Sequence, residues 1–369
     1  MNINIFGSTG VIGKKTLEIV DDYFPNYKVN LLCAKSNIRL LKKQIIKYKP
    51  KYVYIYDLNK YKKLKPNLGK TKLLNFGELL SYLYSSKSNL SVLAISGYKS
   101  LYFLDAIIDN TDNLGIVTKE VIVSAGHIFK KKNYFKKTNI VPLDSEHFSL
   151  FEYFNKSKNK NLIKSIKITA SGGPFYKRKF NSLTNIKFSQ AIKHPKWKMG
   201  YKNSIDSATL VNKCLELVEA HYLFDFKFNK MDILIHPEAL VHSVIEYENY
   251  VTQFNLFKND MRIPLINFLQ NSNQRYNKFS KEFLINDYGK LNFSNVKNNI
   301  FPIYKLFNNL DKTKPHNLIK FNIGNEFAVD MYKDGIIKYT DIYKIIEKVI
   351  SLNLYSSVNN IKDIINYHE

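Results

Sequence analysis

The sequence is poor in cysteine and tryptophan and contains no long apolar run. Cys33 and Cys214 are its two cysteines in 369 residues, and neither stands in a CxxC or Cys/His cluster. These facts exclude a disulfide scaffold, a structural zinc site and a redox dithiol, and they indicate a reducing compartment. No apolar run approaches the roughly 18 to 20 residues that cross a bilayer. We expect a cytoplasmic protein with no membrane partner; a plastid-type compartment stays open if a transit peptide has been removed.

Arginine is scarce although the chain is strongly basic. Four of the 56 basic residues are arginine, and the formal net charge is +25. Nucleic-acid recognition relies heavily on the planar, bidentate guanidinium group, so we expect no nucleic-acid partner. The abundance of lysine and asparagine is what A/T-rich codons alone would produce. A selected polyanion-binding surface is the alternative to a solvated lysine coat.

The first part of the chain alternates strand-like and helix-like segments. Amphipathic stretches such as 11–23 and 40–48 separate the expected strands, which are 2–6, 28–33, 51–56, 91–95, 114–117 and 139–141. This alternation is typical of a parallel sheet with crossover helices. We predict a doubly wound α/β domain over residues 1–144.

The remaining chain has a different pattern. Residues 145–270 predict an α+β catalytic domain, in which one long helix (204–224) accompanies four strands, 164–169, 232–236, 243–247 and 251–257. Residues 271–300 are rich in asparagine, lysine and tyrosine and are expected to form a linker. Residues 301–369 predict a C-terminal helical domain, and the stretch 339–352 has the clearest helical periodicity.

Three glycines stand where the first strand must turn into a helix: Gly7, Gly10 and Gly13. In this context the first allows a tight turn, the second lets backbone amides approach a pyrophosphate, and the third allows close helix packing. The motif predicts a Rossmann-like dinucleotide site; a structural turn is the alternative. The residues expected to contact the cofactor are Gly7, Ser8, Thr9, Gly10, Val11 and Ile12.

A carboxylate is missing at the end of the second strand. NAD-preferring sites usually carry Asp or Glu there to hold the ribose 2′-hydroxyl. This chain has Lys35, Ser36 and Asn37 instead, which can donate to a 2′-phosphate. NADPH is therefore favoured over NADH, although Lys35 could be one more solvated lysine.

Two short segments concentrate acidic and polar groups. Asp144 and Glu146 follow the sixth expected strand, and in an extended segment they would face the same point. Such a pair suits a cation, although helix capping explains it equally well. On the expected helix 204–224, Asn212 and Glu216 share a face beside Lys213, with Ser207 nearer the amino end. That set could grip a phosphate and lend an oxygen to a metal, or be an ordinary helix pair.

Two loops complete the candidate site. Ser171 opens a glycine loop after the strand 164–169 and could wrap a phosphate with backbone amides. Residues 194–200, HPKWKMG, contain the single tryptophan, Trp197, on a glycine-flanked loop. This segment suits a lid that expels water, and a buried loop contact is the alternative.

Taken together, these motifs resemble the 1-deoxy-D-xylulose 5-phosphate reductoisomerase family. The resemblance covers essentially the whole chain and rests on an ordered series: GSTGVIG (7–13), TKE (118–120), PLDSEH (142–147), ASGGPF (170–175), HPKWKMG (194–200), IDSATLVNKCLE (205–216), IHPEALVHS (235–243), DMRIPL (260–265) and GNE (324–326). It implies an NADPH- and Mg²⁺- or Mn²⁺-dependent enzyme, usually a homodimer, that makes 2-C-methyl-D-erythritol 4-phosphate from a phosphorylated sugar.

The resemblance also assigns roles to residues that match its motifs. It implies metal ligands Asp144, Glu146 and Glu216, and substrate-binding residues Ser145, Ser171, His194, Trp197, Ser207, Asn212 and Lys213. It places Lys119, Glu146 and His194 in catalysis, and it adds Glu120 and Gly200 to the cofactor site.

The chain departs from the family pattern at Val11, Thr118, Cys214, Glu238 and Ala239, none of which is an implied metal or phosphate ligand. A thiol at position 214 could crowd the phosphate face or be oxidised. A dehydrogenase of the aspartate-semialdehyde type shares the N-terminal glycine motif but needs a nucleophilic cysteine. Cys214 has no evident neighbouring base on its expected helix, which disfavours that alternative.

Overall fold

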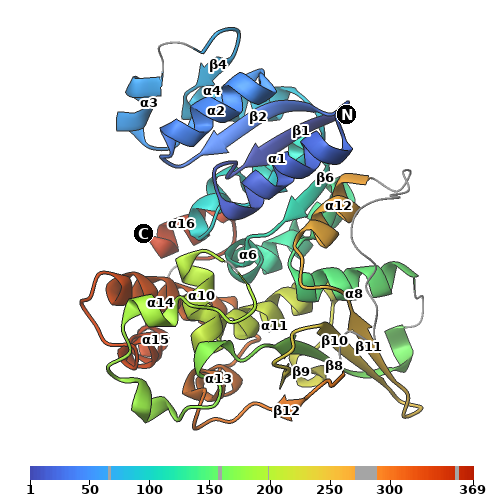
Figure 1. Ribbon diagram of the computed structural model, residues 1–369, viewed down its shortest axis with the longest axis vertical. Helices are drawn as coiled ribbons and strands as arrows, with labels where there is room; N and C mark the ends of the chain where they lie inside the picture. Colours follow the sequence, from blue (N-terminus) through green and yellow to red (C-terminus); the bar gives the residue numbers. More distant parts are fainter. Residues whose placement is uncertain (65–67, 157–159, 198, 271–288, 354–356) are drawn as a thin grey trace. The chain divides into compact units, whose positions relative to one another are not determined.

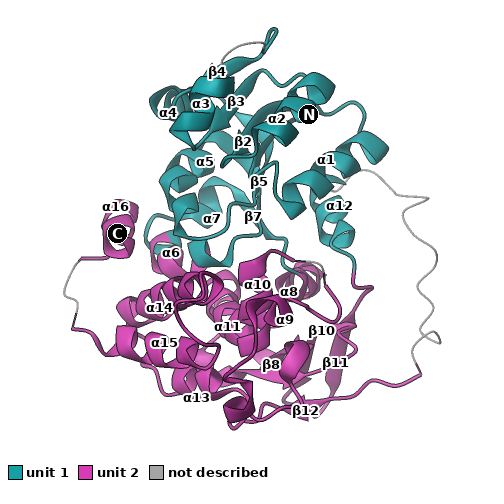
Figure 2. Ribbon diagram, turned by 60° about the vertical axis from the view of Figure 1, so that its left-hand side comes forward, with its two compact units in different colours: residues 1–121, 129–144, 260–274 teal, residues 122–128, 145–259, 275–369 magenta. Residues whose placement is uncertain are grey.

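The computed structural model describes residues 1–64, 68–156, 160–197, 199–270, 289–353 and 357–369 (Figure 1). The chain divides into two compact units (Figure 2). Unit 1 comprises residues 1–121, 129–144 and 260–274, and unit 2 comprises residues 122–128, 145–259 and 275–369. None of the described helices is long and apolar enough to cross a membrane.

Unit 1 is built on a seven-stranded parallel sheet of order β4-β3-β2-β1-β5-β6-β7. Its strands are β1 (Asn2–Phe6), β2 (Lys28–Ala34), β3 (Tyr52–Ile55), β4 (Lys72–Leu74), β5 (Ser88–Leu93), β6 (Thr111–Ile116) and β7 (Asn139–Pro142). The order runs outward from β1 to β4 and then returns to β5 on the other side of β1. Ligands of doubly wound folds bind at this reversal, beyond the carboxyl ends of the strands.

The helices of unit 1 connect these strands. They are α1 (Val11–Tyr23), α2 (Ile38–Tyr48), α3 (Leu58–Leu64), α4 (Phe76–Ser85), α5 (Leu104–Asn110), the start of α6 (Lys119–Lys131), α7 (Tyr134–Lys137) and α12 (Arg262–Gln270). Because right-handed crossovers change face when the strand order reverses, α1 and α2 cover one face and α4 and α5 the other. The packing of α1 on α12 and of α4 on α5 agrees with this arrangement.

Unit 2 contains a mixed five-stranded sheet of order β11-β10-β8-β9-β12. Its strands are β8 (Ile163–Ala170), β9 (Met231–Ile235), β10 (Val241–Tyr247), β11 (Thr252–Leu256) and β12 (Ser294–Asn295). Its helices are α8 (Ser145–Lys156), α9 (Phe188–Ala191), α10 (Tyr201–Thr209), α11 (Val211–Phe224), α13 (Pro302–Asn308), α14 (Pro315–Lys333), α15 (Asp341–Ser351) and α16 (Ile361–His368). Helix α11 packs against α8, β8, α13 and α14, so it forms the centre of this unit.

The expected strands of both sheets are confirmed to within a few residues, and the doubly wound class is confirmed. Strand β4 was not expected, because three residues are too few to show the alternation of apolar and polar side chains that marks a strand. The single helix expected over 204–224 is wrong, since Leu210 adopts a left-handed backbone (φ 67°, ψ 2°) that separates α10 from α11.

Two segments pack differently from the expected division of the chain. Residues 260–270, expected within the catalytic domain, belong to unit 1. There the Phe268 ring of α12 packs against Gly115 of β6. Residues 122–128 of α6 belong to unit 2, where a Cβ on Gly126 would lie 2.1 Å from the Tyr222 ring. Most of the expected linker, residues 271–288, lies outside the described residues.

Candidate active site and metal centre

The glycine turn of unit 1 is held by contacts that exclude any side chain. Gly7 has φ +93°, and a Cβ there would lie 2.4 Å from the carbonyl oxygen of Ala94. A Cβ on Gly13 would lie 2.3 Å from the carbonyl oxygen of Gly7. Helix α1 therefore begins against the end of β1, with Gly10 as its N-cap. The free amides of the first helical turn and their dipole make this edge suitable for a pyrophosphate.

The other expected cofactor residues are in different surroundings. The Ser8 hydroxyl is fully buried and donates to Oε1 of Gln44 at 2.9 Å. Asn37 caps α2 by accepting from the Leu40 amide, whereas Lys35 and Ser36 are exposed at the end of β2. Thr9, Val11 and Ile12 lie in the turn or the first turn of α1, Glu120 is buried near the start of α6, and Gly200 belongs to unit 2.

Three acidic side chains come together around one point. One carboxylate oxygen from each of Asp144, Glu146 and Glu216 lies within 4.8 Å of the others. Asp144 stands two residues before Glu146, so the start of α8 places this pair locally. Glu146 is 8% exposed and Glu216, on α11, is fully buried. The expected extended segment is wrong, because Glu146 lies in the first turn of α8 and not two residues along a strand.

Two ammonium groups balance this buried negative charge. Lys213 Nζ lies 2.8 Å from Oε2 of Glu146 and 2.7 Å from Oε2 of Glu216. Lys119 forms an ion pair with Asp144, and the Asn212 amide donates to Oε1 of Glu216. Buried carboxylates this close repel one another unless a cation stands near them. An all-carboxylate set fits a hard ion such as Mg²⁺ or Mn²⁺.

Two buried histidines, for which the sequence predicted no role, contact the acidic residues. His242 Nδ1 lies 3.1 Å from Oε1 of Glu146, and its ring stacks on Phe257 with centroids 4.0 Å apart. His147 Nε2 donates to the backbone oxygen of Glu216 at 2.8 Å. The signal was present, since both histidines stand inside motifs that carry the resemblance. Their function could not be deduced because each acts on a residue distant in the chain.

Ser171 and His194 form a polar pair at the end of β8. His194 Nδ1 accepts the backbone amides of Lys196 and Trp197 at 3.1 and 2.9 Å, so its hydrogen is on Nε2, which donates to Ser171 Oγ at 3.0 Å. The Gly173 amide also donates to Ser171 Oγ. With both lone pairs engaged, the Ser171 hydroxyl hydrogen is left to meet an acceptor such as a phosphate oxygen.

His194 is neutral at physiological pH. Burial and then the nearby Lys213 charge lower its pKa from 6.5 to about 4, against a smaller opposing effect of Glu146. Because the charges of Lys213 and Glu146 both act on His194, the imidazole lies in the neighbourhood of these two side chains. Gly173 packs against the Ser207 carbonyl, where a Cβ would lie 2.8 Å from the oxygen. Unit 2 thus brings Ser171, His194, Ser207, Lys213 and Glu146 into one neighbourhood.

The structure also describes the surroundings of three other residues that the sequence singled out, Ser145, Trp197 and Cys214. Ser145 donates its hydroxyl to Oε2 of Glu146 at 2.8 Å. Trp197 is half-buried, and the proposed lid includes Lys198, which lies outside the described residues. Cys214 is fully buried, and burial raises the pKa of its thiol far above the ordinary value. A thiol in that state is neither a nucleophile nor an exposed oxidation site.

The departures from the family pattern are accommodated locally. Thr118 donates its hydroxyl to the Ile95 carbonyl at 2.7 Å. Glu238 accepts the side-chain amide of Asn292 at 2.7 Å, and Ala239 adopts φ 56°. None of these contacts takes a donor or acceptor from the acidic group.

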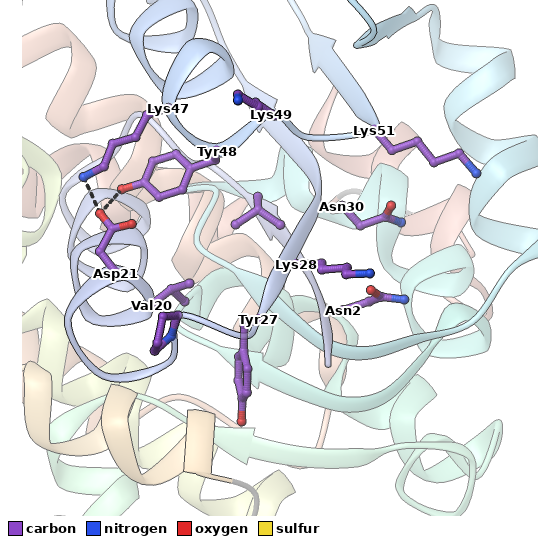
Figure 3. Close-up of a pocket in the computed structure, with 12 residues that line it drawn as sticks. Asn2, Val20, Asp21, Tyr27, Lys28, Asn30, Lys47, Tyr48, Lys49 and Lys51 are labelled. Atoms are coloured by element: carbon purple, nitrogen blue, oxygen red, sulfur yellow. Dashed lines mark hydrogen bonds and ion pairs between the residues drawn. The ribbon is translucent and has the colours of Figure 1, made fainter.

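A cavity of about 540 Å³ lies at the amino edge of the unit 1 sheet, where β1 and β2 begin (Figure 3). Four lysines line it, including Lys47, which pairs with Asp21. The carboxyl ends of α1 and α2 also border it, and cations favour helix carboxyl ends. None of the acidic trio lines this cavity. Lys47 and Lys49 stand at the carboxyl end of α2, and Lys28 and Lys51 stand at the start of β2 and just before β3, away from the acidic trio.

The fold and the site together indicate a class: an enzyme with a Rossmann-like parallel sheet and a carboxylate group suited to a metal ion. Family models agree: that of 1-deoxy-D-xylulose 5-phosphate reductoisomerase matches residues 3–126, and two models of its C-terminal domain match residues 140–224 and 256–369. The reductoisomerase of Thermodesulfovibrio yellowstonii is 33% identical over 98% of this chain and 94% of its own. That of Pelagibacter ubique is 33% identical over 98% and 93%. The chain belongs to the 1-deoxy-D-xylulose 5-phosphate reductoisomerase family.

Solved structures show the same likeness. A reductoisomerase crystallised with NADPH, fosmidomycin and magnesium superposes with a TM-score of 0.92 and 26% identity, covering 100% of this chain and 95% of its own. The Zymomonas mobilis enzyme in complex with NADPH gives 0.85 and 28%, with 100% and 96% covered.

Proposed function

We propose that this chain converts 1-deoxy-D-xylulose 5-phosphate to 2-C-methyl-D-erythritol 4-phosphate, with NADPH as reductant and Mg²⁺ or Mn²⁺ as cofactor. The observation that carries the proposal is the meeting of Asp144, Glu146 and Glu216 within 4.8 Å. A parallel sheet with a glycine turn supports a dinucleotide site of the kind that the reduction needs.

Asp144, Glu146 and Glu216 would hold the divalent ion. When bound there, the ion supplies the Lewis acidity that polarises the carbonyl and neighbouring hydroxyl oxygens of the substrate. His242 contacts Glu146 and His147 contacts the Glu216 backbone, so these histidines would orient two of the three metal ligands.

The phosphate of the substrate would bind to Ser171, Ser207, Asn212 and Lys213. Neutral His194 orients the Ser171 hydroxyl through its Nε2–H, and the Lys213 ammonium supplies the charge. Binding energy from this remote group fixes the reacting carbons in position. Lys119 and Ser145 would contact the carbon chain, and residues 194–200 with Trp197 would exclude water.

NADPH would bind at the glycine turn of residues 7–12, with Lys35, Ser36 and Asn37 meeting the 2′-phosphate and Glu120 and Gly200 completing the site. The exposure of Lys35 and Ser36 at the end of β2 supports this assignment. Asn37 is the weakest member, because its side-chain oxygen already caps α2.

We also propose that the chain acts as a homodimer, without a nucleic-acid or membrane partner, in a reducing compartment such as the cytoplasm. Two free, buried thiols support the compartment. Sedimentation velocity tests the dimer, and a monomer at micromolar concentration would contradict it.

The decisive assay follows NADPH oxidation with 1-deoxy-D-xylulose 5-phosphate. We expect turnover that stops with a chelator and returns with Mg²⁺ or Mn²⁺. Turnover that persists in the chelator would overturn the metal assignment. Absence of turnover at every metal concentration would overturn the substrate assignment.

A further inference from the structure

The break between α10 and α11 falls at Leu210, a residue type that disfavours the left-handed backbone found there. Leu210 is 1% exposed and has φ 67° and ψ 2°, a left-handed backbone that bulky side chains rarely adopt. Glycine or asparagine is the usual residue at such a position. Strain retained between Ser207 and Lys213, both proposed phosphate ligands, invites a functional explanation.

A continuous helix would separate the groups that the proposed site needs together. Each residue of an α-helix advances about 100° around the axis. Glu216 lies nine positions after Ser207, which places them about 180° apart after whole turns, and Ser207 and Asn212 would be about 140° apart. An unbroken helix could not direct both ends of this segment at one point.

The observed contacts place the two ends of the broken helix beside different parts of the proposed site. At the end of α10, the Ser207 carbonyl lies against Gly173 of the Ser171 loop. At the start of α11, Lys213 reaches Glu146 and Glu216. The Leu210 carbonyl becomes the first acceptor of α11, taking the amides of Lys213 and Cys214 at 3.1 and 3.3 Å.

A distant tyrosine makes a hydrogen bond at the break. The Tyr339 hydroxyl donates to the Ala208 carbonyl at 2.8 Å, and Tyr339 is 1% exposed. In a continuous helix that carbonyl would accept the amide of Asn212, four residues on. Tyr339 therefore occupies an acceptor that the unbroken helix would use.

We propose that Leu210 is a positioning residue, whose left-handed backbone aims Ser207 and the Asn212–Lys213–Glu216 face at one phosphate, and that Tyr339 maintains this break. The inference rests on the proposed phosphate role of Ser207 and Lys213. Leu210 touches neither substrate nor cofactor in this account, and it acts only through the direction of the two helices.

Two substitutions separate backbone conformation from packing. Leu210→Ile keeps the side-chain volume but adds β-branching, which disfavours the left-handed region. Leu210→Gly keeps the conformation and loses the side chain. We expect Leu210→Ile to raise the KM for 1-deoxy-D-xylulose 5-phosphate and the Kd for inorganic phosphate about tenfold, with the Kd for NADPH unchanged. Leu210→Gly should lower Tm yet keep this KM within about threefold.

Tyr339→Phe is the milder second variant, in case Leu210→Ile does not fold. It removes one hydrogen bond, and we expect a rise of about threefold in the same KM. Leu217→Ala is the matched control for stability, because Leu217 is a buried residue further along α11. It should lower Tm without changing the KM.

The outcomes distinguish this inference from the function on which it rests. If Lys213→Met leaves the KM and the phosphate Kd unchanged, the phosphate site itself is wrong. If Lys213→Met raises both but Leu210→Ile and Tyr339→Phe raise neither, only the role of Leu210 is overturned. A rise for Leu217→Ala equal to that of Leu210→Ile would also overturn it, because the KM would then follow stability alone.

Discussion

Lys213 and Glu216 lie one turn apart on α11, and the Lys213 ammonium is 2.7 Å from a carboxylate oxygen of Glu216. The same nitrogen is 2.8 Å from Glu146. A proposed phosphate ligand thus contacts two proposed metal ligands. The proposed phosphate and metal sites are therefore adjacent at Lys213, and substitutions at different residues can test each of them separately.

Glu216→Gln tests the metal centre. The substitution keeps the shape but removes one negative charge from a fully buried ligand. We expect kcat to fall by about 100-fold or more, with the Kd for NADPH changed less than twofold. Steady-state kinetics over a Mn²⁺ titration and NADPH fluorescence measure the two effects. The control is Glu152→Gln, a carboxylate paired with Lys156 on the surface of α8; weakened NADPH binding alone would refute the metal role.

Gly13→Ala tests the cofactor turn. The added Cβ would lie 2.3 Å from the Gly7 carbonyl oxygen, so the turn must shift. We expect a loss of about 2 kcal/mol in the free energy of unfolding and at least tenfold weaker NADPH binding. The Cβ of Gly77→Ala, at an exposed position of α4, meets nothing nearer than 3.5 Å, and this substitution should stabilise the protein slightly. Equal NADPH affinity for both variants would refute the role of the turn.

Lys35→Ala tests the preference for NADPH. If Lys35 meets the 2′-phosphate, its removal should raise the KM for NADPH about tenfold and leave the KM for NADH unchanged. The ratio of kcat/KM for the two cofactors measures this effect. Lys348→Ala, an exposed lysine of α15, should leave the ratio unaltered. An enzyme equally efficient with NADH before any substitution would contradict the assignment.

The lowered pKa of His194 predicts a pH-dependent stability. Between pH 6.5 and about 4 the unfolded imidazole binds a proton that the folded one does not. The free energy of unfolding should therefore fall through this window as the pH drops, by on the order of 2 kcal/mol from this residue. Urea unfolding of the native chain and of His194→Gln at pH 7 and pH 4.5 isolates the effect. Parallel losses in both proteins would show that His194 titrates normally.

The buried thiols should not react in the folded protein. Cys33 and Cys214 are both buried, and burial raises the pKa of each. We expect no thiol to react with a thiol-blocking reagent at pH 7.5 in native buffer, with activity intact, and both to react in denaturant. Rapid reaction of the native enzyme with loss of activity would show that position 214 opens to solvent.

Much of unit 1 could be predicted because its signals are local. The strand 2–6, the glycine turn and the helix 11–23 match the structure residue for residue. Strand β4 was missed because three residues carry no period, and it forms only by pairing with β3. The direction of Asp144 and Glu146 was predicted for the wrong reason, since a helix and not a strand places Glu146.

The sequence by itself determined the residue types: strand and helix periods, three glycines at a turn, and carboxylates, lysines and hydroxyls in ordered motifs. Those features follow from backbone geometry and side-chain chemistry over a few neighbouring residues. Only the tertiary structure showed where α11 begins, after Leu210, where a tyrosine 131 residues from Ala208 donates to the carbonyl that a continuous helix would use. It also decided that His242 meets Glu146, across 96 residues. Contacts over such separations depend on how whole elements pack, which a local pattern does not contain.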